Sequence, residues 1–167
     1  MHYLIGVIVY GKKKEEAFNK AKSILENLCG DYKAFDYYST ADDSFSRWKG
    51  PKVLRVDCKK GKELMTRLMG YTEKNFMEAL ELVKKALGNY TDEELFEEKD
   101  KEMFRHRCHC IGQYEGYEIH LYDNDGSGIR TKSHLENVLS KWKCLGGEYP
   151  KKYVDMNIYI VPADVHS

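Results

Sequence analysis

Apolar residues along the chain form short continuous runs that alternate with longer amphipathic stretches. Residues 3–10, YLIGVIVY, make a nearly unbroken apolar run rich in β-branched side chains, which is typical of a central β-strand. After Gly11 the period changes, because the apolar residues of 12–29 fall on one helical stripe with Lys and Glu on the other side. Gly30 stands where a helix C-cap glycine is expected. The chain therefore opens with a predicted strand and an amphipathic helix.

The same patterns divide the rest of the chain. One helix is predicted over 73–88, and an acidic helix over about 92–103 opens with a capping box that begins at Thr91. A last helix is predicted at 131–143, and further strands at 31–38, 52–58, 106–113, 116–123 and 153–161. The resulting order of elements predicts an α+β fold, a single mixed β-sheet with helices packed on a face, with ferredoxin-like elements. No linker or repeat interrupts this order, so residues 1–167 are predicted to form a single domain.

A polar, turn-rich segment at 39–51 stands between two predicted strands and is expected to be a surface loop. It contains Phe45, Arg47 and Trp48, whose large side chains must either pack on the body of the protein or contact a partner. Aromatic side chains on loops supply contact area at a low cost in conformational entropy. We therefore take these three residues as candidate binding residues.

The composition is that of a globular chain. Of 167 residues, 42% are hydrophobic and 32% are charged, and Lys plus Arg balance Asp plus Glu at 27 each. A neutral chain argues against a dedicated nucleic-acid surface, which needs surplus positive charge facing phosphates. The charge is uneven, however: 92–102 carries seven acidic residues, whereas 141–152 carries four lysines. Such patches can steer a partner, although the oligomeric state stays open.

The chain shows no membrane or export signal. No apolar run reaches the length of a membrane span, and the basic cluster at 12–14 follows the first apolar run, unlike that of a signal peptide. The five cysteines are odd in number and widely spread. Together these features predict a cytoplasmic protein with reduced thiols and no membrane partner.

The stretch 122–129, YDNDGSGI, resembles the front half of a calcium-binding loop. Residues suited to positions 1, 3, 5 and 6 of such a loop are Asp123, Asp125, Ser127 and Gly128. Position 12 is His134 where a bidentate Glu is required, so calcium is not expected. The Asp residues, with Gly126 and Gly128, instead predict a tight strand-to-helix turn. As a further alternative, backbone amides of this turn could receive an anion, a small ligand or a nucleotide.

A second candidate site lies at His106, Cys108 and Cys110, which share one face of a predicted strand. Zinc favours these ligands. A fourth ligand would have to come from elsewhere in the fold, and the candidates are Cys58, His120, His134 and Cys144. Cysteines on an inward strand face more often act as small hydrophobic residues, so the sequence predicts no cofactor and keeps zinc as the alternative.

A third candidate is the alternating set Glu118, His120 and Tyr122, which lines the predicted polar face of one strand. A carboxylate, an imidazole and a phenol on one face could perform acid–base catalysis, whereas most such faces are only solvated surface. Groups within 164–166 could join a site, but terminal residues commonly fray. The motifs of nucleotide loops, Rossmann folds, α/β-hydrolases and zincins are all missing from the chain.

Several short pieces of the chain carry a resemblance to a known group of proteins. They are VIVYGKKKEEAFNKA, FDYY with the later SRWKG, DNDGSG, Trp142 and the final ADVH. In these pieces the chain resembles small proteins of phages, prophages and archaeal mobile elements. It departs from that pattern before Arg47, where paired glycines are missing. The resemblance implies an accessory protein that binds and blocks a host component, including host defence systems, without chemistry of its own.

Three hypotheses for function follow. The first is a non-enzymatic binding protein of a phage or mobile element that blocks a host protein or ribonucleoprotein. The second is a small zinc- or cysteine-dependent enzyme centred on His106, Cys108, Cys110 and His120. The third is a binder of small ligands or nucleotides at the 123–130 turn.

Overall fold

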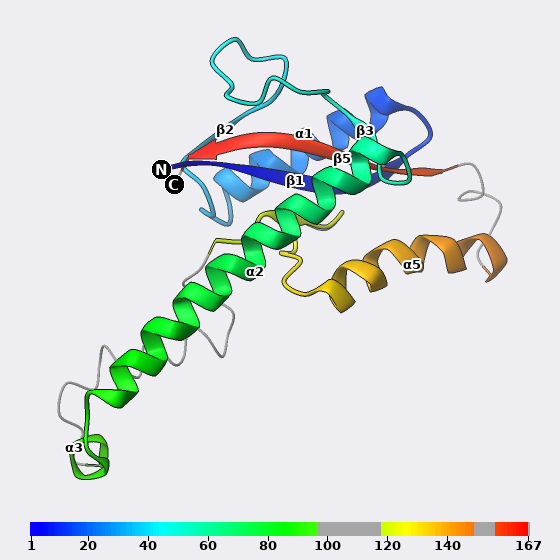
Figure 1. Ribbon diagram of the computed structural model, residues 1–167. Helices are drawn as coiled ribbons and strands as arrows, with labels where there is room; N and C mark the ends of the chain where they lie inside the picture. The colour runs from blue at the N-terminus through cyan, green and yellow to red at the C-terminus, as the bar shows by residue number, and fades with distance from the viewer. Residues whose placement is uncertain (97–117, 149–155, 167) are drawn as a thin grey trace.

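The computed structural model describes residues 1–96, 118–148 and 156–166. One mixed sheet contains every described strand, and the predicted α+β class is confirmed (Figure 1). The strands are β1 His2–Gly11, β2 Tyr37–Ser39, β3 Leu54–Arg55, β4 Leu121–Tyr122 and β5 Asn157–His166. The sheet order is β2-β5-β1-β4, and β3 also pairs with β5.

The long strands β1 and β5 form the centre of the sheet. They pair antiparallel over their whole length, from His2 opposite His166 to Gly11 opposite Asn157. Strand β2 pairs antiparallel with the other edge of β5, so β5 lies between the parallel strands β1 and β2. Helix α1, Lys14–Cys29, joins these two strands, and the unit is therefore a split β-α-β, the predicted ferredoxin-like element. Strand β4 pairs with β1 in parallel.

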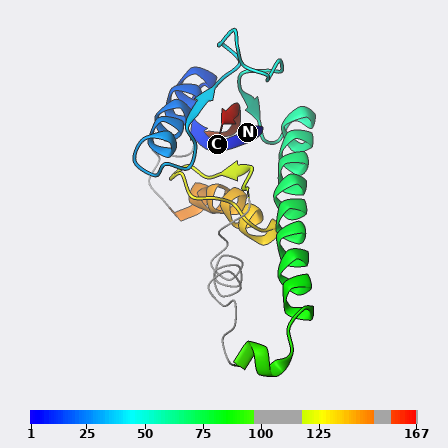
Figure 2. The same ribbon diagram turned by 90° about the vertical axis from the view of Figure 1, so that its left-hand side faces the viewer.

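Helices cover both faces of the sheet (Figure 2). Helix α1 packs on one face, where the buried cluster includes Ile5, Val7 and Val9 of β1. Helix α2, Lys59–Gly88, and helix α5, Lys132–Glu148, contribute to a second cluster on the other face, around Ile8 and Ile160. This arrangement follows from the strand period of two, because alternate apolar residues of β1 point to opposite faces. Both faces are apolar, which explains the nearly unbroken run at 3–10.

Helix α2 is longer than predicted, since it begins at Lys59 and not near 73. The glycines at 61 and 70 interrupt the sequence signal for a helix, yet each is accommodated for a different reason. A Cβ at Gly61 would collide with the carbonyl oxygen of Arg55, so glycine lets the helix begin directly beside β3. Gly70 faces open space.

Among the described residues, no helix combines the length and apolarity needed to span a bilayer.

Short helix α3, Asp92–Phe96, begins with the predicted capping box. The Thr91 hydroxyl accepts from the Glu94 amide at 3.1 Å, and the Glu94 carboxylate accepts from the Thr91 amide at 3.0 Å. The rest of the predicted acidic helix and the predicted hairpin around 114–116 lie outside the described residues.

Strand β5 runs to His166, five residues beyond the predicted end at 161, because its pairing with β1 continues as far as His166.

Candidate functional site

The two ends of the chain meet at one end of the sheet (Figure 1). The register places Tyr37 of β2 opposite His166 of β5, and His166 opposite His2 of β1. In the next row on the same face, Asp164 lies between Ser39 and Leu4. Polar side chains therefore replace the apolar cluster where this face reaches the end of the sheet.

Asp164 is the buried anchor of this region, with an exposed fraction of only 4%. Its Oδ1 lies 3.3 Å from Nδ1 of His2, and its Oδ2 accepts a hydrogen bond from the Arg47 backbone amide at 3.1 Å. The Tyr37 hydroxyl lies 3.2 Å from Nε2 of His2. These contacts allow His2 to donate from Nδ1 to the carboxylate while Nε2 contacts the phenol. Asp164 thus ties the two central strands to the loop that carries Arg47.

That loop, residues 40–53, has an ordered internal structure. The Asp43 carboxylate accepts from both the amide and the hydroxyl of Thr40, at 2.6 and 3.1 Å. The Trp48 indole donates from Nε1 to the Pro51 carbonyl oxygen at 3.0 Å. A Cβ at Gly50 would collide with the Trp48 ring, so the glycine allows the indole to fold back over its own loop. The loop therefore presents Arg47 and Trp48 from a fixed backbone.

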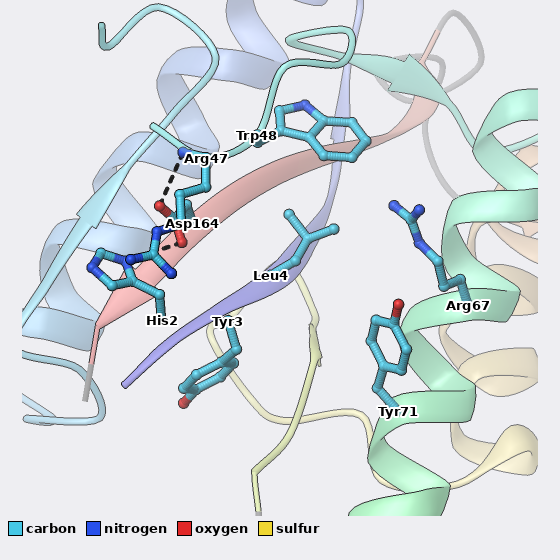
Figure 3. A pocket seen from close by; sticks show the side chains of 8 residues that line it. All are labelled: His2, Tyr3, Leu4, Arg47, Trp48, Arg67, Tyr71 and Asp164. Carbon is cyan, nitrogen blue, oxygen red and sulfur yellow. Dashed lines mark hydrogen bonds and ion pairs between the residues drawn. The ribbon is translucent and has the colours of Figure 1, made fainter. Parts of the chain in front are cut away.

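A pocket of about 300 Å³ lies between this loop, the end of the sheet and helix α2 (Figure 3). Its floor is formed by β1, its wall on one side by the loop with Arg47 and Trp48, and its wall on the other side by Arg67 and Tyr71 of α2. The described residues that line it are His2, Tyr3, Leu4, Arg47, Trp48, Arg67, Tyr71 and Asp164. Four segments that are distant in sequence thus build one site.

The described lining of the pocket has a surplus of positive charge, since it holds two arginines and one carboxylate. Arg47 and Arg67 are both exposed, and within the described residues neither guanidinium forms a hydrogen bond or an ion pair. The Arg67 guanidinium carbon lies 5.7 Å from the centre of the Trp48 ring, a cation–π arrangement. Among the described lining residues Asp164 is the acidic one, and its carboxylate contacts His2 and the Arg47 amide but neither guanidinium group. The site therefore suits an anionic group beside a planar one.

Of the three loop residues predicted to bind, two belong to this pocket. Arg47 and Trp48 line it, whereas Phe45 is 67% exposed on the same loop and does not line it. Six further described residues line the pocket. Sequence reasoning named Asp164, within 164–166, as a residue that could join a site, and it missed His2, Tyr3, Leu4, Arg67 and Tyr71. Asp164 lies beyond the predicted end of the last strand at 161, so its place in the sheet opposite Leu4 was not predicted.

The stretch 123–128 forms a turn, as its glycines and aspartates predict. The Asp123 Oδ1 accepts from the amides of Asp125 and Ser127, at 3.0 and 2.9 Å. Gly126 has φ of 81°, in the left-handed region that favours glycine, and Gly128 forms a β-bridge with Tyr122. The turn residues do not line the pocket, so the structure does not bring the two predicted binding segments together.

The predicted polar face of Glu118, His120 and Tyr122 is wrong for two of its three residues. His120 is 5% exposed and Tyr122 is 8% exposed, because β1, α1 and α2 cover this short edge strand on both faces. Burial, together with the neighbouring Tyr3, raises the pKa of Tyr122, so its phenol stays protonated. Only Glu118 keeps substantial exposure, with its carboxylate 4.0 Å from His120.

His120 joins three elements through hydrogen bonds. Its Nδ1 lies 2.6 Å from the Leu4 carbonyl oxygen, its Nε2 lies 3.1 Å from Nδ2 of Asn75, and its amide donates to the Thr72 hydroxyl at 2.9 Å. The geometry suits a neutral imidazole that donates from Nδ1 and accepts at Nε2. Burial lowers the pKa of His120, against the opposing effects of the Leu4 carbonyl and the Glu118 carboxylate. The imidazole is thus a structural link and not a solvated acid–base group.

The free energy of unfolding is expected to fall as the pH drops below about 6.5, the pKa of an exposed histidine. His120 is held neutral in the folded state and takes up a proton more readily when unfolded, so this part of the stability is present above that pH. Its contribution is lost as the pH falls towards the lowered pKa, by at most about 1.4 kcal/mol per pH unit. Urea unfolding of the wild type and of His120→Gln from about pH 7.5 to about pH 5 measures this contribution of His120. If the free energy of unfolding depends on pH in the same way in the two proteins, His120 does not contribute to the pH dependence.

The predicted zinc ligands His106, Cys108 and Cys110 lie outside the described residues. Cys58 is half-buried at the start of α2, where its sulfur accepts from the Gly61 amide at 3.3 Å. In the parts of the chain that the structure describes, no group of three His, Cys, Asp or Glu side chains is placed to hold a metal ion.

Comparison with known proteins adds a family but no described activity. Neither the curated proteins nor the solved structures yield a match to this chain. A family model described as a domain of unknown function, DUF7995, matches residues 1–167. The chain therefore belongs to the DUF7995 family.

Proposed function

We propose that the protein is a non-enzymatic binding protein that recognises an anionic group of a partner molecule in the pocket between the 40–53 loop and α2. The observation that carries this proposal is the pair Arg47 and Arg67, two exposed guanidinium groups in one pocket without acidic partners among the described residues. Guanidinium groups favour carboxylates and phosphates, with which they form paired, charge-assisted hydrogen bonds.

The pocket residues whose side chains are capable of acid–base chemistry hold the site together. The His2 imidazole lies between Asp164 and Tyr37, and the Asp164 carboxylate accepts from the loop backbone. Their engagement supports recognition over catalysis. The resemblance to proteins of mobile elements extends the proposal to an accessory protein, acting in the cytoplasm, whose partner is a host macromolecule.

Titration of the full chain with pyrophosphate, followed by NMR, tests this proposal. The chain has two tryptophans, so its indole signals are simple, and Trp48→Phe assigns the signal of the pocket. We expect the Trp48 indole to shift and saturate with pyrophosphate but not with sodium chloride of equal ionic strength. The double variant Arg47→Gln/Arg67→Gln should abolish the saturation, whereas Arg55→Gln, which removes an arginine paired with Asp57, should leave it unchanged. Equal shifts with chloride, or saturation in the double variant, would refute the proposal.

A further inference from the structure

A second depression adjoins the first across the Trp48 side chain. It has a volume of about 360 Å³ and lies over the start of α2. It shares Trp48 and Arg67 with the first pocket, and its other lining residues are Pro51, Leu54, Lys60, Glu63 and Leu64. Trp48 and Arg67, whose guanidinium carbon lies 5.7 Å from the ring centre, therefore form a partition with a pocket on either side.

Positive groups and aromatic rings both line this surface. Arg47 lies at one end, Arg67 stands at the partition, and Lys60 belongs to the far pocket. Two aromatic side chains lie among them, Trp48 at the partition and Tyr71 on α2, which is 40% exposed. Figure 3 shows Arg47 and Arg67 on opposite sides of the first pocket, with Trp48 and Leu4 between them. The surface thus offers charge and ring faces to the same ligand.

We infer that the partner is a single-stranded nucleic acid, which would lie across the partition with a nucleotide in each pocket. This inference rests on the proposed function, since it names the anion that the pocket receives. A nucleotide supplies both the phosphate that Arg47, Arg67 and Lys60 favour and the planar base that Trp48 and Tyr71 favour. Two adjoining open pockets of similar size match a polymer with a repeating unit better than one small ligand.

The neutral charge of the whole chain does not oppose this inference. Affinity for phosphates depends on the charges close to the strand, because ionic strength screens distant ones. Near the partition the described acidic residues are Glu63, in the far pocket, and the buried Asp164, whose carboxylate is engaged. An acidic peptide would match the arginines, but its carboxylates would make no use of the Trp48 and Tyr71 rings that line the first pocket.

Fluorescence anisotropy with labelled oligonucleotides of about twelve nucleotides tests the inference on the full chain. We expect an oligouridine or an oligothymidine to bind more tightly than a duplex of equal length and than an oligoglutamate. Tighter binding of the oligouridine would identify the partner as RNA, and tighter binding of the oligothymidine would identify it as DNA. In Arg67→Gln the affinity should fall about tenfold, and the slope of log affinity against log salt should decrease by about 0.7. Arg55→Gln carries the same change in charge away from the partition and should bind as the wild type does.

The other outcomes distinguish a failure of the nucleic-acid inference from a failure of the proposed function. Tight binding of pyrophosphate without binding of either single strand would overturn the nucleic-acid inference and leave the proposed function standing. Equal or tighter binding of the duplex or of oligoglutamate, or an unchanged affinity in Arg67→Gln, would overturn it in the same way. Failure to bind any of these anions would overturn both.

Discussion

Replacing Asp164 with alanine is expected to lower the free energy of unfolding by about 3 kcal/mol and to weaken anion binding by at least about tenfold. The carboxylate is buried and joins His2 of β1 to the Arg47 amide of the loop. Its removal leaves the His2 imidazole and the Arg47 amide without their acceptor at a buried position. Because the loop backbone is held at this point, its release also withdraws the Arg47 side chain from the pocket.

Urea unfolding and pyrophosphate titration measure the two effects separately. Asp36→Ala is the matched control, since Asp36 forms a comparable contact with His166 at 2.9 Å but its side chain is 66% exposed. An exposed pair of this kind contributes at most about 1 kcal/mol. If Asp164→Ala and Asp36→Ala lower the stability equally, Asp164 is not the anchor that its burial indicates.

Replacing Leu68 with alanine is expected to lower the free energy of unfolding by about 2–5 kcal/mol. Leu68 has no exposed surface and packs from α2 onto the sheet within the second buried cluster. A Cβ at Gly6 would stand 2.8 Å from its Cδ1, so the glycine of β1 provides the space into which the leucine fits. Removing the isobutyl group leaves a cavity that the rigid central strands cannot close.

The control for this variant lies on the same helix. Leu82 is 57% exposed, so Leu82→Ala should change the stability by no more than about 0.5 kcal/mol in chemical unfolding. Pyrophosphate affinity offers a second readout, because Leu68 lies one turn or less from Arg67 and Tyr71 on α2. A loss below about 1 kcal/mol in Leu68→Ala would show that α2 is not fixed to the sheet as described.

Local patterns predicted the fold well where they were strong. The β-branched run of β1, the stripe of α1 and the Thr91 capping box are each readable within a few residues, and each is present. The first half of α2 was missed because two glycines weaken the helix signal, although Leu64 and Leu68 keep the helical spacing. The sequence does not distinguish Gly61, which lies against the Arg55 backbone, from Gly70, which faces open space.

The site was only half predictable, because it depends on long-range pairing. Arg47 and Trp48 could be identified within one polar loop, without knowledge of the fold. His2 and Asp164 are 162 residues apart, and only the register of β1 and β5 brings them together. The alternation that predicted a solvent-exposed face for His120 is present in the sequence. The exposure of the His120 side chain is decided, however, by the elements that pack around this short edge of the sheet.

A crystal structure of the full chain with pyrophosphate tests the central claim most directly. We predict that the anion lies in the pocket within hydrogen-bonding distance of both the Arg47 and the Arg67 guanidinium groups, with Asp164 still bound to the Arg47 amide. Pyrophosphate bound elsewhere, for example at the start of α5, with this pocket filled only by water, would contradict the claim.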